Sequence, residues 1–255
     1  MSSFSERGYI LLNGFFIGLS VAFVICVIVF LVERLKECSV KATVLKATAS
    51  LLFVILACVA VLIKSDNADY GMMFIIGMLL CTIGDIWLDL KYVHKEYDEQ
   101  YTFIGIGSFM VSHIFYLIGI LLAYPEFIGW QVALAIFSAL SVSVIERLLS
   151  KKTGFEYGKF KALTFVYSIV IMLTVTFALN AVNAFGWLPV LGGAEMPAVM
   201  PRFLCMNMGT VIFALSDLSL SIAFFKKGGN TKLNVVIIHI TYYLAQYLLA
   251  LSILM

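Results

Sequence analysis

The chain has 255 residues, of which 62% are apolar and 13% are charged, and its formal net charge is +2. Average soluble domains carry about 25% charged residues, and a soluble globule has too little interior to bury so much apolar surface. The composition therefore excludes a soluble enzyme, a nucleic-acid-binding protein and a disordered chain. What remains is a protein that crosses a membrane several times.

Eight continuous apolar runs are long enough to cross a membrane as helices, which takes about 20 residues each. The runs do not alternate apolar and polar residues, so a β-barrel is not expected. Together they predict an all-α protein with a single integral membrane domain over residues 1–255. In chain order the expected spans are 8–32, 44–63, 71–90, 102–123, 127–145, 162–186, 203–225 and 233–254.

Basic residues gather on one side of these spans, in the loops that follow the first, third, fifth and seventh. The other side holds Arg7, Lys64 and Arg202. By the positive-inside rule, the basic loops face the cytoplasm and both termini face away from it, in a bacterial inner membrane or the endoplasmic reticulum. The basic residues of the predicted cytoplasmic side are Arg34, Lys36, Lys41, Lys91, Lys95, Arg147, Lys151, Lys152, Lys159, Lys161, Lys226, Lys227 and Lys232.

Four formally charged residues lie inside the expected spans, namely Lys46, Asp85, Asp89 and Asp217. A charge at the centre of the bilayer costs at least about 2.5–3.5 kcal/mol, so such a residue usually has a partner or faces a cavity. All four fall in the half of the membrane nearer the basic loops. We therefore expect one polar cavity that opens toward the inner leaflet or the cytosol.

Simpler explanations exist for single residues. Asp89 is close enough to a helix end to be solvated, and Lys46 is close enough to extend its ammonium group to the surface. Asp85 suits a structural pair with a Lys or Tyr side chain. A histidine within a span, such as His113, is often hydrogen-bonded to a neighbouring helix, and tyrosines often mark the membrane interface.

The pattern G-x7-D-x2-L occurs twice, over residues 77–88 and again 132 residues later over 209–220. Its aspartates are Asp85 and Asp217, which lie on the third and seventh spans. Membrane folds often contain internal repeats related by a twofold axis. The pattern predicts two parallel four-helix halves, with the two carboxyl groups facing each other near that axis.

Other polar residues share helix faces with one another. Asp85 and Asp89 are four residues apart, as are Tyr242 and Gln246, while His113 and Tyr116 are three apart. Residues at these spacings lie on one face of a helix.

These residues resemble the motifs of the YhhN family of membrane proteins, in the family's order along the chain. Lys46 lies where the family usually has Lys-Pro, although Ala47 replaces the proline here. The matching residues are Gly84, Asp85, Leu88, Gly105, Phe109, His113 and Tyr116 in a central motif, Gly209, Phe213, Ser216 and Asp217 in a second, and Tyr242 or Tyr243 with Ala245 and Gln246 in the last helix.

The resemblance implies eight transmembrane helices and lysoplasmalogenase activity. This reaction hydrolyses the vinyl ether bond of a lysoplasmalogen to a fatty aldehyde and glycerophosphocholine or glycerophosphoethanolamine. The implied partners are the lysophospholipid substrate and membrane lipids.

The residues suit this chemistry. Vinyl ether hydrolysis needs a proton donor to carbon, an anion beside the oxocarbenium ion and a positioned water, and two carboxyls suffice if one is neutral and one ionised. We expect Asp85 and Asp217 to be this catalytic pair, with either one as the acid. Supporting or substrate-binding roles are expected for Lys46, Asp89, His113, Tyr116, Ser216, Tyr242, Tyr243 and Gln246.

No cofactor is expected, because the sequence has no HxxxH or HExxH motif. A divalent metal held by two Asp and one His is the alternative. An alternative function is a proton-coupled transporter of small molecules or lipids, since inward carboxyls and two parallel halves suit one, but no pair of spans is broken by Gly or Pro. A lipid-binding or scaffold protein is a third alternative, which leaves the paired aspartates unexplained.

Overall fold

The computed structural model describes residues 2–184 and 195–255. Within these residues the chain forms eight long helices and no β-strand, and the connections that are described throughout are short, some with a single 3-10 turn. The helices are α1 (Ser2–Lys36), α2 (Val40–Ile63), α3 (Ala68–Val93), α4 (Asp98–Ala123), α5 (Gly129–Lys152), α6 (Lys161–Ala184), α8 (Met200–Phe225) and α9 (Lys232–Leu254).

All eight described helices are long and apolar enough to cross a membrane, which confirms the predicted all-α fold of eight helices. Most helices extend beyond the apolar runs. Because α1 reaches Lys36 and α5 reaches Lys152, Arg34 and Arg147 lie on helices and not in loops as the sequence predicted. The predicted end of the sixth span, at 186, lies outside the described residues.

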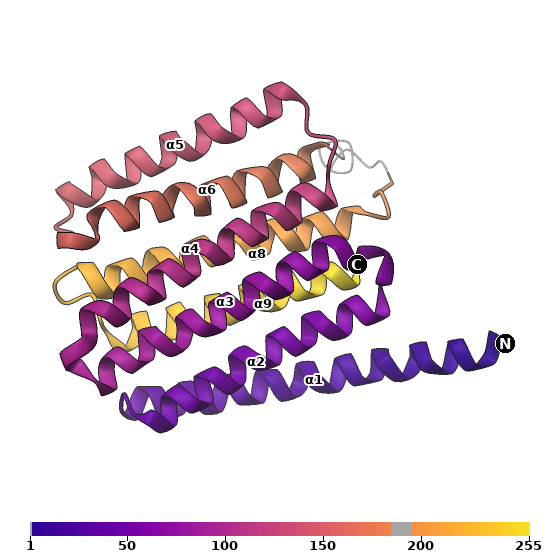
Figure 1. Cartoon of the computed structure of the whole chain (residues 1–255), viewed down its shortest axis with the longest axis horizontal. Helices are drawn as coiled ribbons and strands as arrows, with labels where there is room; N and C mark the ends of the chain where they lie inside the picture. The colour runs from indigo at the N-terminus through magenta and orange to yellow at the C-terminus, as the bar shows by residue number, and fades with distance from the viewer. Residues whose placement is uncertain (1, 185–194) are drawn as a thin grey trace.

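Six helices form a closed ring, in which the order of packing is α2, α3, α4, α6, α8, α9 and back to α2. Outside the ring, α1 packs against α2 and α9, and α5 packs against α6 (Figure 1). The two marked ends of the chain lie at the same end of the bundle (Figure 1). An even number of spans requires this, whereas the side of the membrane that they face stays a prediction.

Packing follows the same order in both halves of the chain. The pairs α1–α2, α2–α3 and α3–α4 of the first half correspond to α5–α6, α6–α8 and α8–α9 of the second. In a ring of this order, α3 and α8 lie on opposite sides. Each contains 26 residues, and Asp85 and Asp217 each lie eight residues before the last one.

The glycines of the repeated pattern allow close packing within each half. A Cβ atom at Gly77 would collide with the ring of Tyr116 on α4, and one at Gly209 would lie 3.0 Å from Leu249 Cγ on α9. Small residues are typical where membrane helices approach closely. In both halves, the missing side chain of the glycine therefore allows the next helix to pack closely against the helix that carries the aspartate.

Candidate active site

A cavity of about 40 Å³ lies between α1, α2, α3, α4, α8 and α9. At roughly 10–15 Å³ for each water, it has room for about three water molecules. It brings together all four charged residues that the sequence places inside the spans. The polar residues of its lining are Arg34, Lys46, Asp85, Asp89, Tyr92, Ser216, Asp217, Asn230, His239 and Tyr242.

Asp85 is buried and makes three polar contacts with neighbouring helices. Lys46 Nζ on α2 lies 3.1 Å from its Oδ1. Its Oδ2 accepts hydrogen bonds from the hydroxyls of Ser50 on α2 and Tyr242 on α9, each at 2.6 Å. Both carboxyl oxygens therefore face donors, which is the environment that an ionised carboxylate needs when it is buried.

Asp89, one turn further along α3, is paired with two cations. Lys46 Nζ also lies 3.2 Å from Asp89 Oδ1, and Arg34 Nη1 on α1 lies 3.7 Å from Oδ2. The side chains of Arg34 and Asp89 are only 7% and 2% exposed. Lys46 and Arg34 thus balance the charges of Asp85 and Asp89 inside the protein.

Asp217 has different surroundings. Its Oδ2 accepts a hydrogen bond of 2.6 Å from the Tyr167 hydroxyl on α6 and lies 3.9 Å from His113 Nε2 on α4. Among the described residues, no Lys or Arg forms an ion pair with Asp217. Both ring nitrogens of the buried His113 are without a hydrogen-bond partner in the described part of the chain.

The partners of the two aspartates come from corresponding helices. Asp85 is contacted by α2 and α9, and Asp217 by α6 and α4, which hold the matching places in the ring. The partners themselves differ in chemistry. Helix α2 contributes Lys46 and Ser50 to Asp85, whereas α6 contributes Tyr167 to Asp217. The site is therefore symmetric in its backbone arrangement and asymmetric in charge.

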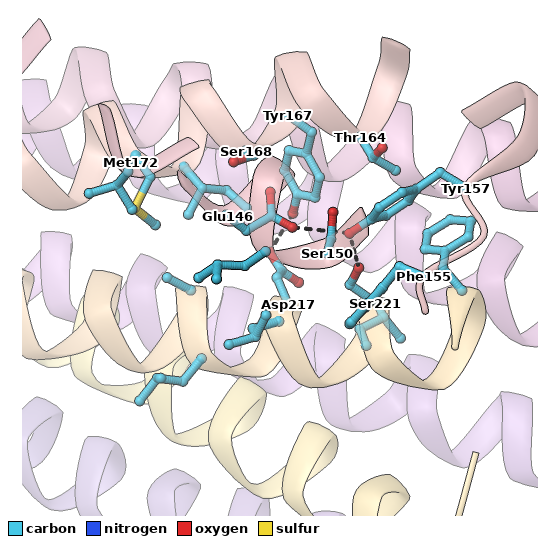
Figure 2. Close-up of a pocket in the computed structure, with 18 of the residues that line it drawn as sticks. Glu146, Ser150, Phe155, Tyr157, Thr164, Tyr167, Ser168, Met172, Asp217 and Ser221 are labelled. Carbon is cyan, nitrogen blue, oxygen red and sulfur yellow. Dashed lines mark hydrogen bonds between the residues drawn. The ribbon is translucent and has the colours of Figure 1, made fainter. Parts of the chain in front are cut away.

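A second and larger pocket, of about 590 Å³, lies between α5, α6 and α8 (Figure 2). Its lining is mostly apolar. Asp217, Leu220 and Phe224 line both this pocket and the smaller polar cavity. Asp217 is thus the carboxyl that lies at the boundary between an apolar pocket and a polar cavity.

The sequence model of the YhhN family matches residues 41–253, nearly the whole chain. The chain belongs to the YhhN family. The match confirms the resemblance that the motifs indicate. No curated protein sequence and no solved structure gives a significant match.

The YhhN match begins at residue 41 and so leaves out α1. Arg34, which pairs with Asp89, lies on that helix. Part of the charge balance at the cavity therefore comes from a segment outside the YhhN match.

Several predicted site residues form hydrogen bonds between helices and not with the aspartates, and three of them, Tyr116, Tyr243 and Gln246, do not line the cavity. The Tyr116 hydroxyl donates to Gln246 Oε1 at 2.8 Å, and both side chains are buried away from the cavity lining. The Tyr243 hydroxyl donates to the Lys46 carbonyl oxygen at 3.2 Å. Ser216 lines the cavity, but its hydroxyl donates to the Ile238 carbonyl at 2.9 Å. These contacts link helices around the site.

Three residues whose side chains contact the aspartates, Ser50, Arg34 and Tyr167, are not among the site residues that the sequence predicts. Ser50 lies four residues after Lys46, a spacing that places both on one helix face and so gives a signal. Arg34 follows an apolar run and has the pattern of a topology-setting basic residue. Tyr167 resembles an interfacial tyrosine, and nothing near it in the sequence links it to Asp217, 50 residues away.

The described residues contain no group of three or more His, Cys, Asp or Glu side chains that could hold a metal ion. Asp85 and Asp89 are both paired with Lys46, whose Nζ lies 3.1 Å from Asp85 Oδ1 and 3.2 Å from Asp89 Oδ1. The set of two Asp and one His that the sequence offered as ligands is therefore not assembled in the described part of the chain.

Proposed function

We propose that this protein hydrolyses the vinyl ether bond of lysoplasmalogens by carboxyl acid–base catalysis within the membrane. Members of the YhhN family are known for this activity. The observation that supports the proposal here is that Asp85 and Asp217 line one cavity. Asp85 forms an ion pair with Lys46, whereas Asp217 has no Lys or Arg partner among the described residues.

Charge balance gives the two aspartates different roles. Arg34, Lys46, Asp85 and Asp89 together carry no net charge when all four are ionised. An ionised Asp217 would add a buried negative charge without a cation, which is costly in a site of low dielectric constant. Asp217 is therefore the proton donor in this proposal, and Asp85 is the anion.

The reaction follows from these roles. Asp217 gives its proton to the vinyl carbon that is second from the ether oxygen, and the electrons of the double bond form the new C–H bond. The resulting oxocarbenium ion is stabilised by the nearby carboxylates. Water adds to this cation and loses a proton to the Asp217 carboxylate, which restores the acid. The hemiacetal hydroxyl then loses its proton and forms the C=O bond of the aldehyde, while the bond to the glycerol oxygen breaks and that oxygen takes up a proton.

Neighbouring side chains assist the donor. After proton transfer, Asp217 is a carboxylate and the Tyr167 hydroxyl stabilises it through the hydrogen bond of 2.6 Å. The polar cavity between the aspartates has room for the attacking water. His113, at 3.9 Å from Asp217, is a positioning residue for the carboxyl in this scheme.

The test is an aldehyde assay on the purified full chain in detergent, with lysoplasmenylcholine and lysoplasmenylethanolamine as substrates. Wild type should release aldehyde with and without a chelator. Asp85→Asn and Asp217→Asn should each lower the rate by at least a hundredfold while the protein stays folded. Asp98→Asn, whose side chain is 61% exposed, is the matched control and should retain full activity.

The assay also separates hydrolysis from transport, the alternative function. The described helices run without a break, whereas many secondary transporters bind substrate at interrupted helices. A folded wild-type protein that releases no aldehyde from either substrate, and moves lipid across liposomes, would overturn the proposal. Loss of activity with the chelator would show that a metal is required.

A further inference from the structure

The pocket between α5, α6 and α8 has two ends with different chemistry. The end nearer the middle of the helices is apolar, with Ile171, Met172, Val175 and Val211. The end nearer the basic loops is rich in hydroxyls. Ser150, Tyr157, Thr164 and Ser221 lie there (Figure 2), as does Thr153, which directly follows α5. Glu146 borders this end and lies nearer Asp217 (Figure 2). Asp217 and Tyr167 lie between these ends, because both are one turn or more inside their helices.

This pocket is open on the lipid-facing side. Among the described helices, α5 packs chiefly against α6, so no tight contact closes the space between α5 and α8. Lining side chains on both helices are exposed, including Ile145 at 54% and Leu218 at 46%. In a membrane-spanning protein, exposed apolar side chains of this kind face the bilayer. A lipid can therefore reach the pocket sideways, without passing through water.

We propose that this pocket binds a lipid with a single hydrocarbon chain, with the chain at its apolar end and the glycerol and phosphate at its hydroxyl-rich end. The inference rests on the proposed function and names the binding site of that substrate. A volume of about 590 Å³ is in the usual range for a small-ligand site, roughly 300–1,000 Å³. The pocket is a single apolar space beside Asp217. A single space of this size suits a lipid with one hydrocarbon chain and not one with two.

The position of Asp217 fits this orientation. It lies eight residues before the end of α8, or about 12 Å at 1.5 Å per residue. A lipid whose phosphate lies near the helix end would therefore place its first chain atoms, where the ether bond is, close to Asp217. The chain would continue toward Ile171 and Val175.

The hydroxyl-rich end contains a hydrogen-bonded cluster that suits a glycerol hydroxyl. The Tyr157 hydroxyl donates to Glu146 Oε1 at 3.0 Å and lies 3.4 Å from Ser221 Oγ. Burial raises the pKa of Tyr157 above its ordinary value, so this hydroxyl stays protonated at neutral pH. Glu146 then accepts from Tyr157 through one oxygen and can accept a ligand hydroxyl through the other. Lipids with a second acyl chain lack a free hydroxyl there.

Cations at the same end suit the phosphate. The Arg147 guanidinium lies 4.3 Å from the centre of the Tyr157 ring, and Lys226 Nζ lies 5.9 Å from that of Phe155. Tyr157 and Phe155 both line the pocket. Arginine and lysine are the usual partners of phosphate oxygens.

The first test uses an uncleavable probe, a lysophospholipid with a saturated ether chain that carries a diazirine near its end. Irradiation of the detergent-purified full chain should label peptides of α5, α6 and α8. Ile145→Trp should reduce labelling at least fivefold, because the indole fills the pocket from its open side. Leu148→Trp is the matched control, since Leu148 is 56% exposed on the same helix but does not line the pocket.

The second test concerns the glycerol hydroxyl. Glu146→Gln should weaken binding of the probe about tenfold, consistent with loss of a hydrogen bond to a charged group. Binding of an analogue without the hydroxyl at glycerol carbon 2 should be the same in wild type and Glu146→Gln. An equal loss for both ligands would overturn the role of Glu146.

The probe also separates this inference from the proposed function. Labelling of the three helices without any aldehyde release would leave the lipid site standing and overturn the hydrolase. Aldehyde release by a protein whose labelled peptides come from other helices would overturn the lipid site alone.

Discussion

Asp85 and Asp217 hold the same position in two helices of equal length, but among the described residues only Asp85 is paired with a cation, Lys46, at 3.1 Å. Two aspartates in the same surroundings would share one function. Here Asp85 is paired with Lys46 and Asp217 with Tyr167, so the two carboxyls at one cavity have partners of different charge. That difference underlies the proposed division into acid and anion.

Lys46→Met tests the charge balance. The substitution leaves Asp85 without a cation and Asp89 with Arg34 alone, and breaking a buried pair costs about 3–5 kcal/mol. We expect a clear fall in the melting temperature in detergent. Lys41→Met is the control, because Lys41 lies on the same helix with its side chain 69% exposed. The double variant Lys46→Met/Asp85→Asn should lose less stability than the sum of the single variants. Additive losses would contradict the pairing.

Tyr167→Phe tests the stabilisation of the donor. Removal of a hydrogen bond to a charged group costs about 1.5–3 kcal/mol, so kcat for aldehyde release should fall roughly 10- to 100-fold. Tyr116→Phe removes a comparable hydrogen bond, to Gln246, away from the cavity. That control should change the melting temperature more than kcat. Equal kcat losses in both variants would show that Tyr167 has no special role.

Gly77→Ala tests the packing of α3 against α4. The new methyl group would meet the Tyr116 ring and lie 3.1 Å from the Ser112 carbonyl oxygen. We expect the melting temperature to fall. At Gly107 on α4 a Cβ meets no atom within 4 Å, so Gly107→Ala should be neutral or slightly stabilising through helix propensity. Comparable stability of both variants would argue against the close α3–α4 contact.

The native Cys38 provides a test of membrane orientation. It is exposed and lies between α1 and α2, beside the basic residues predicted to face the cytoplasm. A membrane-impermeant maleimide should label it in inside-out vesicles and fail to label it in intact cells. Cys38→Ser is the control for labelling of other cysteines. Labelling from outside intact cells would reverse the predicted topology.

Sequence reasoning predicted the spans because each is a continuous apolar run of about 20 residues or more, a signal that depends on no other part of the chain. It did not predict where the helices end. Basic side chains near the membrane surface continue a helix without adding apolar residues. The sequence therefore predicts a loop at Arg34 and gives no sign of its contact with Asp89.

The candidate site was predicted as far as it consists of charges in an apolar background, which is how Lys46, Asp85, Asp89 and Asp217 were found. Tyr167 was missed because its role arises from the packing of α6 against α8. The pocket between α5, α6 and α8 was missed for a similar reason. It exists because α5 lies outside the ring, and that position leaves no pattern in the sequence.

The most direct test of the central claim follows the proton that Asp217 is proposed to donate to carbon. Wild type should be given lysoplasmenylcholine in D₂O, and the aldehyde analysed by mass spectrometry at once, with aldehyde added to Asp217→Asn as the control for exchange. The account predicts one deuterium on the carbon next to the aldehyde group, and an Asp217→Asn rate at least a hundredfold lower. Aldehyde without that deuterium, or an unchanged rate in a folded Asp217→Asn protein, would contradict it.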